Sequence, residues 1–175
     1  CKCNLGSGIV ATSLGTPSST QAGNCSREVI QAGGEVRFDV DATCLSDYDL
    51  GDFDFMVFNF PHTGARQTGR TPGLIQASIE SNQNLLCGVF RSAAVVLRRH
   101  GRIHITLKNV YPYSQWNIVR IALQFGWKCL RTFEFPQQQL RDLGYAHETT
   151  LNLQQRVILK EPTTFEFVRS CTGLT

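Results

Sequence analysis

The sequence predicts an α/β domain in which a mostly parallel sheet carries helices on both faces and ends in an antiparallel pair of strands. Short strand-like runs alternate with amphipathic stretches along the chain, which is typical of parallel α/β sheets. Residues 54–60 are apolar almost without interruption, as in a strand buried on both faces. The last two strand-like runs are separated by a polar stretch, which favours antiparallel pairing at the end of the sheet.

Each element has its own local signal. β-branched residues or polar–apolar alternation indicate strands, and the clearest helix, at 81–99, repeats its apolar residues every three or four positions. Its basic last turn, followed by Gly101, suits a helix C-terminus. The expected elements are strands at 8–14, 35–40, 54–60, 102–110, 128–135 and 164–169, and helices at 26–32, 81–99 and 114–126.

Length and composition limit the classes of protein that remain. The chain has 175 residues, 42% hydrophobic and 18% charged, which fits one globular domain over residues 1–175 with tails at 1–7 and 171–175. No apolar run approaches the roughly 20 residues of a membrane span, so no membrane partner is expected. The net charge of +3 permits an RNA partner. Seven irregularly spaced cysteines make a poor disulfide framework and no complete metal site, so we expect a nuclear, nucleolar or cytoplasmic protein.

The most distinctive segment follows the buried strand at 54–60. Ligands of parallel α/β sheets bind beyond the carboxyl ends of the strands, and Asn59, Phe60, Pro61 and His62 lie at such an end. Asn59 offers donors and an acceptor to the edge of a nucleobase, Phe60 could stack on a flat ring, and His62 could take up a proton. The alternative is structural: Asn59 and His62 would satisfy backbone groups of a tight loop, and Phe60 would belong to the core.

Other strand ends carry further candidates. Asp41 could accept hydrogen bonds from a ribose or an adenine amino group, or it could form an Asx-turn. Lys108 and Arg66 could contact phosphates, although both could equally be solvated. Tyr113 could cover a pocket.

Five segments resemble one family in the right order. They are Ile-Val-Ala-Thr-Ser-Leu (9–14), Val-Arg-Phe-Asp-Val-Asp-Ala-Thr (36–43), Asp-Phe-Asp-Phe-Met-Val-Phe-Asn-Phe-Pro-His-Thr-Gly (52–64), Gly-Arg-Ile-His-Ile-Thr-Leu-Lys (101–108) and Pro-Tyr-Ser-Gln-Trp-Asn-Ile (112–118). They resemble the large-subunit rRNA (uridine-N(3))-methyltransferase-like domain family. The resemblance implies a Rossmann-like sheet, the cofactor S-adenosyl-L-methionine (AdoMet), and methyl transfer to a uridine of ribosomal RNA.

The resemblance also implies roles for single residues. Asn59 to His62 would act on the uracil, Arg66, Lys108 and Tyr113 would hold the RNA, and Ser13, Gly15, Asp41 and Ala42 would hold AdoMet. Two features differ from the family pattern. No glycine loop with a preceding strand stands before Gly8, so the central first strand is expected to be missing and the domain to be N-terminally incomplete. Gly15 stands where the family has an Asp that grips the ribose. The alternative function is a non-catalytic RNA- or protein-binding relic that has lost the cofactor site.

Overall fold

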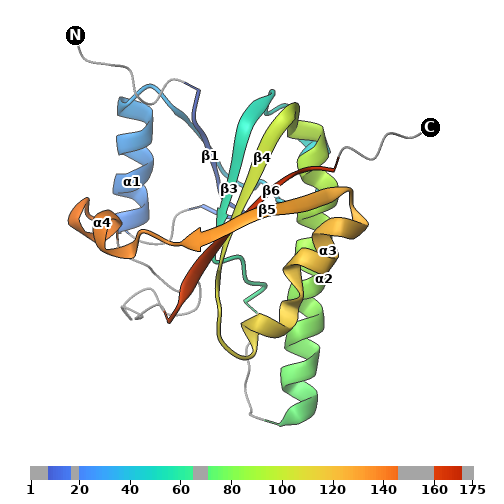
Figure 1. Ribbon diagram of the computed structural model, residues 1–175. Helices are drawn as coiled ribbons and strands as arrows, with labels where there is room; N and C mark the ends of the chain where they lie inside the picture. Colours follow the sequence, from blue (N-terminus) through green and yellow to red (C-terminus); the bar gives the residue numbers. More distant parts are fainter. Residues whose placement is uncertain (1–7, 17–19, 65–70, 146–159, 171–175) are drawn as a thin grey trace.

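A computed structural model describes residues 8–16, 20–64, 71–145 and 160–170, and Figure 1 shows their arrangement. The expected alternation of strands and helices is confirmed, with one added helix, α4. The elements are β1 (Val10–Thr12), α1 (Thr20–Gln31), β2 (Glu35–Arg37), β3 (Phe53–Asn59), α2 (Pro72–Val96), β4 (Leu97–Lys108), α3 (Ile118–Gln124), β5 (Trp127–Glu134), α4 (Gln137–Asp142) and β6 (Pro162–Arg169), with 3-10 turns η1 (Leu45–Asp47) and η2 (Tyr113–Trp116). No helix of the described segments is long and apolar enough to cross a membrane.

The strands form two groups. One has the order β3-β4-β6-β5, in which β3 and β4 are parallel and β6 is antiparallel to both neighbours. The other is the parallel pair β1-β2. Among the described residues no strand joins β1 to β3. The mostly parallel sheet, its late antiparallel pair and its helices on both sides agree with the predicted fold class (Figure 1).

The main core lies between the four-stranded sheet and the helices α2 and α3. Leu86 and Phe90 of α2 are fully buried against Ile103 and Ile105 of β4. Phe90 also meets Phe167 of β6 edge to face at 4.9 Å, and its carbonyl oxygen accepts a hydrogen bond from the indole of Trp127. Burial of this apolar face is the main contribution to the stability of the domain.

The prediction that β3 is buried on both faces is wrong. Phe55 is 56% exposed and Val57 is 60% exposed, so the described residues leave this face of β3 largely uncovered. Met56 and Phe58, on the opposite face, pack against the main core. The two faces of β3 are therefore both apolar in sequence, but only the face with Met56 and Phe58 is packed against the core.

The boundary between α2 and β4 also differs from the prediction. The helix begins at Pro72 and ends at Val96, so Arg98 and Arg99 belong to the strand, and Gly101 does not end a helix. Pairing with β3 makes the difference: Leu97 aligns with Phe53, and Arg98 forms an ion pair with Asp54. A side chain at Gly101 would meet Leu97 Cβ at 3.1 Å, so this glycine allows a close approach within the strand.

Three further predictions need correction. The helix α1 starts at Thr20, six residues before the predicted start. The strand β2 ends at Arg37, because Asp39 has φ 60° and interrupts the extended backbone. The predicted helix at 114–126 is split by Asn117, whose φ of 52° separates η2 from α3.

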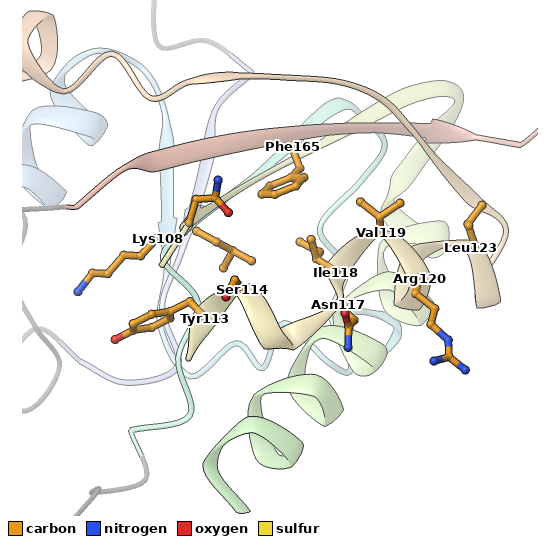
Figure 2. Close-up of a pocket in the computed structure, with 11 residues that line it drawn as sticks. Lys108, Tyr113, Ser114, Asn117, Ile118, Val119, Arg120, Leu123 and Phe165 are labelled. Atoms are coloured by element: carbon orange, nitrogen blue, oxygen red, sulfur yellow. The ribbon is translucent and has the colours of Figure 1, made fainter. Parts of the chain in front are cut away.

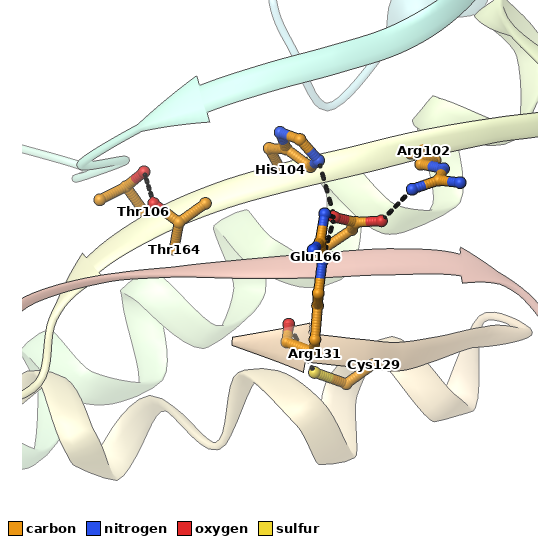
Figure 3. Close-up of polar contacts among 7 residues, drawn as sticks. All are labelled: Arg102, His104, Thr106, Cys129, Arg131, Thr164 and Glu166. Carbon is orange, nitrogen blue, oxygen red and sulfur yellow. Dashed lines mark hydrogen bonds and ion pairs between the residues drawn. The ribbon is translucent and has the colours of Figure 1, made fainter. Parts of the chain in front are cut away.

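The outer face of the sheet, opposite α2 and α3, carries a polar cluster (Figure 3). Glu166 of β6 is fully buried and receives hydrogen bonds from Arg102 and Arg131 of the neighbouring strands. Burial alone would raise the pKa of Glu166, but the hydrogen bonds and charges of Arg131 and Arg102 outweigh it and lower the pKa. The carboxylate therefore stays ionised and links three strands.

Candidate active site at the strand ends

Asn59, the last residue of β3, is held by a side-chain hydrogen bond from Thr106 of β4. Thr106 Oγ1 donates to Asn59 Oδ1 at 2.8 Å, and the hydroxyls of Thr106 and Thr164 are 3.0 Å apart. Asn59 itself is exposed, whereas both threonines are buried. The carboxamide is thus anchored through its oxygen at the surface of the strand end.

Phe60 is half-buried. Its ring meets Phe135 edge to face at 5.3 Å, and its backbone N–H donates to Thr106 O at 2.8 Å. A φ of 54° at Phe60 turns the chain sharply away from β3, and the buried Pro61 follows. Phe60 and Pro61 therefore shape the loop, and whether the Phe60 ring also stacks on a base stays a prediction.

His62 is half-buried beside two aromatic rings, with ring centroids 6.4 Å from Tyr113 and 6.0 Å from Trp116. Burial and the positive charge of Lys108 lower the pKa of His62, so its imidazole is neutral near neutral pH. Nδ1 accepts a hydrogen bond from the Gly64 N–H at 2.9 Å. The proton of the neutral ring therefore resides on Nε2, which is a donor.

Asn82 of α2 is a site residue that the sequence reasoning missed. It is fully buried, its Oδ1 accepts from the Thr63 N–H at 3.0 Å, and its Nδ2 donates to Ser78 O at 2.8 Å. An Asn at a buried position of an amphipathic helix was the available signal, because buried amides need partners. Asn82 fixes the distance between α2 and the loop that carries His62.

Lys108, the last residue of β4, lies beside Tyr113, the first residue of η2. The ammonium of Lys108 is 5.3 Å from the centre of the Tyr113 ring. Burial lowers the pKa of Lys108 and raises the pKa of Tyr113. Both line a pocket of about 490 Å³, between β4, η2, α3 and Phe165 of β6, which also includes Arg120 (Figure 2).

The cofactor candidates lie apart from these residues, at the ends of β1 and β2. The Ser13 hydroxyl donates to Gly15 O at 2.7 Å, and both residues are exposed. Asp41 forms the Asx-turn that was its structural alternative, because its Oδ1 accepts from the N–H and the hydroxyl of Thr43, each at 2.8 Å. Ala42 packs against the main core.

These residues fit AdoMet in part. The second carboxylate oxygen of Asp41 accepts no hydrogen bond from the described residues, so it can receive an adenosine donor. At Gly15 an added Cβ would have open space, so the family's Asp would fit sterically, but the glycine supplies no carboxylate for the ribose. Arg66 and the expected tails at 1–7 and 171–175 lie outside the described residues. The described residues themselves contain no cluster of metal ligands.

Comparison with known proteins places the chain in a family. Residues 2–149 match the sequence model of the BMT5-like family, described as rRNA (uridine-N3-)-methyltransferase BTM5-like. The chain belongs to this family. It is also 37% identical over 106 residues to Uncharacterized protein At4g26485 of Arabidopsis thaliana, covering 59% of this chain and 50% of that protein. The chain thus spans about half the length of that curated relative.

Solved structures share the fold. NSun6 from Pyrococcus horikoshii with SFG has a TM-score of 0.51 and 19% identity, covering 94% of this chain and 42% of that chain. A methyltransferase homolog protein from Pyrococcus horikoshii has a TM-score of 0.50 and 16% identity, covering 93% of this chain and 53% of that chain. At these identities the likeness concerns the fold, which is the Rossmann-like methyltransferase fold expected from the sequence.

Proposed function

We propose that this domain belongs to an AdoMet-dependent RNA methyltransferase that methylates N3 of a uridine in large-subunit ribosomal RNA. Family membership and fold support methyl transfer to RNA. The observation that carries the choice of base is the set of donors beside β3 and β4: the Asn59 amide, His62 Nε2–H and the Lys108 ammonium.

The chemistry of uridine explains why donors are needed. N3 carries a proton between two carbonyl groups and becomes a nucleophile when that proton passes to solvent water. The resulting negative charge is shared by N3, O2 and O4, so hydrogen-bond donors and a cation near the oxygens favour the anion. AdoMet, when bound, supplies the electrophilic methyl group.

His62 would act as a donor rather than as the base that the sequence suggested. Its Nδ1 is engaged by the Gly64 N–H, and its lowered pKa keeps the ring neutral. A neutral imidazole that donates from Nε2 can stabilise a developing oxyanion without a prior change of protonation. The charge of Lys108 would add to this effect, because its half-buried position strengthens the electrostatic interaction.

The pocket beside Lys108 and Tyr113 is suited to the rest of the RNA. Leu107, Ile118 and Phe165 make its wall apolar, and Arg120 adds a second cation. Figure 2 shows Lys108 and Tyr113 at one end of this group and Arg120 at the other. A nucleotide next to the target uridine could place its base on the apolar wall and its phosphates near the cations.

Gly15 and the Asx-turn at Asp41 favour a second candidate, an RNA- or protein-binding relic without the cofactor site. Calorimetric titration with AdoMet separates the two candidates. Micromolar binding with a raised melting temperature would support the enzyme, and no binding by a cooperatively folded protein would favour the relic.

Methyl transfer tests the proposed roles of the loop residues. The protein is incubated with AdoMet and unmodified large-subunit rRNA, and N3-methyluridine is measured by mass spectrometry of the nucleosides. We expect Asn59→Ala and His62→Ala each to lower the rate about 100-fold, as for loss of one oxyanion donor. His100→Ala, an exposed histidine of β4, is the control. Unchanged rates in both loop variants would contradict the proposal.

A further inference from the structure

Two buried threonines on the outer face of the sheet determine which way the Asn59 carboxamide points. Thr106 of β4 is 1% exposed and Thr164 of β6 is 4% exposed. The two residues are directly paired across the antiparallel ladder, and Figure 3 shows their hydroxyls facing each other. Neither hydroxyl has access to bulk water, so each must find its partners within this group.

The direction of the hydrogen bonds follows from counting protons. A hydroxyl has one proton to donate, and Thr106 donates it to Asn59 Oδ1. The contact of 3.0 Å between the two hydroxyls then requires Thr164 to donate and Thr106 to accept. Thr164 therefore donates to Thr106, and Thr106 donates to the carbonyl oxygen of Asn59.

This order leaves Asn59 with donors at the surface. Its carbonyl oxygen already accepts from Thr106, and its Nδ2 donates to no group among the described residues. Asn59 is exposed at the carboxyl end of β3, so the amide N–H groups are available to a ligand. Without the threonines, an exposed carboxamide could present either its oxygen or its nitrogen.

We propose that the Thr164–Thr106 hydroxyl pair orients Asn59 as an obligate donor and so makes the site select a base with a carbonyl group, such as uracil, over a base with an amino group at the same position, such as cytosine. Uracil O4 accepts from Asn59 Nδ2, whereas the N4 amino group of cytosine would bring two donors together and leave both unsatisfied. Thr106 and Thr164 are positioning residues that act through Asn59. The inference rests on the proposed function for its substrate, an RNA base, and adds the origin of its specificity.

Binding to the Asn59 side chain can be observed without methyl transfer. The ¹⁵N-labelled protein is titrated with oligouridylate and with oligocytidylate, and the Asn59 side-chain amide signal, assigned by its loss in Asn59→Asp, is followed by NMR. We expect oligouridylate to shift this signal and to bind about 10-fold more tightly than oligocytidylate. Equal shifts and affinities, or no shift with either polymer, would overturn the inference.

Variants of the threonines test the cause. Thr106→Val has nearly the same shape but no hydroxyl, so the carboxamide can turn over, and the preference for oligouridylate should fall towards 1-fold. Thr106→Ser keeps the hydroxyl and should therefore keep the preference for oligouridylate. Thr164→Val should weaken the preference less but measurably, because Thr106 can still donate to Asn59 but no longer receives the hydrogen bond that fixes this direction. Thr132→Val, on an exposed position of β5, is the matched control.

The possible results separate this inference from the proposed function. A preference for oligouridylate that disappears in Thr106→Val and returns in Thr106→Ser supports the inference, even if no methyl transfer is detected. A Thr106→Val protein that keeps the full preference and a native melting profile would overturn it. If Thr106→Val does not fold, Thr164→Val serves as the test. An unchanged preference of Thr164→Val for oligouridylate over oligocytidylate would overturn the inference.

Discussion

The four-stranded half of the molecule and the β1-β2 half differ in how their strand ends are held. Asn59 at the end of β3 and the loop that carries His62 are held, in the four-stranded half, by buried side chains of three other elements: Asn82, Thr106 and Thr164. The side chains of Ser13 and Asp41, in the β1-β2 half, bond to neighbours two residues away in the chain. The Asn59 side chain and the loop that follows it are therefore held by side chains from distant parts of the chain, whereas the Ser13 and Asp41 side chains are held by local hydrogen bonds.

The core supplies the sharpest test of this difference. Phe90→Ala removes a fully buried ring that packs on Phe167, and we expect a loss of about 3–5 kcal/mol in the free energy of unfolding. Phe38→Ala, in the β1-β2 half and 37% exposed, should cost about 1 kcal/mol. Urea unfolding followed by circular dichroism gives both values. Similar losses in the two variants would mean that the halves are equally well packed.

The contact between the halves is tested at Gly88 of α2. A Cβ at this position would lie 2.6 Å from Thr43 Cβ, in the turn formed by Asp41. Gly88→Ala should therefore push the turn away from α2 and cost about 1–3 kcal/mol in thermal or urea unfolding.

The matched control is Gly23→Ala in α1, where an added Cβ meets nothing within 4 Å. This change should stabilise the protein by about 0.5–1 kcal/mol, because alanine favours a helix over glycine. A neutral Gly88→Ala would show that the turn at Asp41 is not packed against α2.

The outer face of the four-stranded half makes stability depend on pH. The pKa of Glu166 is lowered in the folded state, so its stabilising effect is complete above the ordinary glutamate pKa of about 4.3 and is lost as the pH falls through the lower folded value. Glu166→Gln should cost about 1 kcal/mol at neutral pH, since its bonds to Arg102 and Arg131 lose their charge.

Urea midpoints measured at pH 7 and below pH 4 check this expectation. The difference between wild type and Glu166→Gln should shrink in acid, and Glu134→Gln, at an exposed position of β5, should show no such change. A difference that stays constant with pH would argue against an ionised Glu166 in the folded state.

The smallest effect on stability, and the most direct test of the β1-β2 half, is expected for Gly15→Asp. Open space around Gly15 admits the side chain, so the free energy of unfolding should change by less than about 0.5 kcal/mol. AdoMet should bind more tightly in calorimetry if this carboxylate reaches the ribose hydroxyls. Gly73→Asp, which adds the same charge at the exposed start of α2, is the control. Equal affinity in both variants would mean that the end of β1 does not face the cofactor.

Local sequence signals predicted the bounds of an element well where pairing with a neighbouring strand did not shift those bounds. Strands β5 and β6 lie within two residues of their predicted ends, because polar–apolar alternation reports the two faces directly. The end of α2 was misplaced because Leu97 and Arg98 continue the helical pattern in sequence but pair with β3 in space. The exposure of Phe55 likewise depends on what packs over the outer face of β3.

The candidate site shows the same division. Asn59, His62, Lys108 and Asp41 could be chosen from the sequence, because polar residues directly after apolar strands mark the ligand-binding edge of a parallel sheet. Asn82, Thr106 and Thr164 could not be assigned to this site, since they lie 19 to 58 residues from their partners in the chain. Their partners become neighbours only when the sheet forms.

The sequence by itself determined the order of strands and helices, the family, and the residues at the strand ends, because all three depend on local pattern. The tertiary structure alone decided which of these residues are held and in which direction their hydrogen bonds run. The direction of the Asn59 amide and the charge of Glu166 each depend on a partner from another element, whereas the protonated nitrogen of His62 depends on Gly64 of its own loop. Hydrogen-bond direction is set by burial and by the available donors, and neither exists before the strands pair.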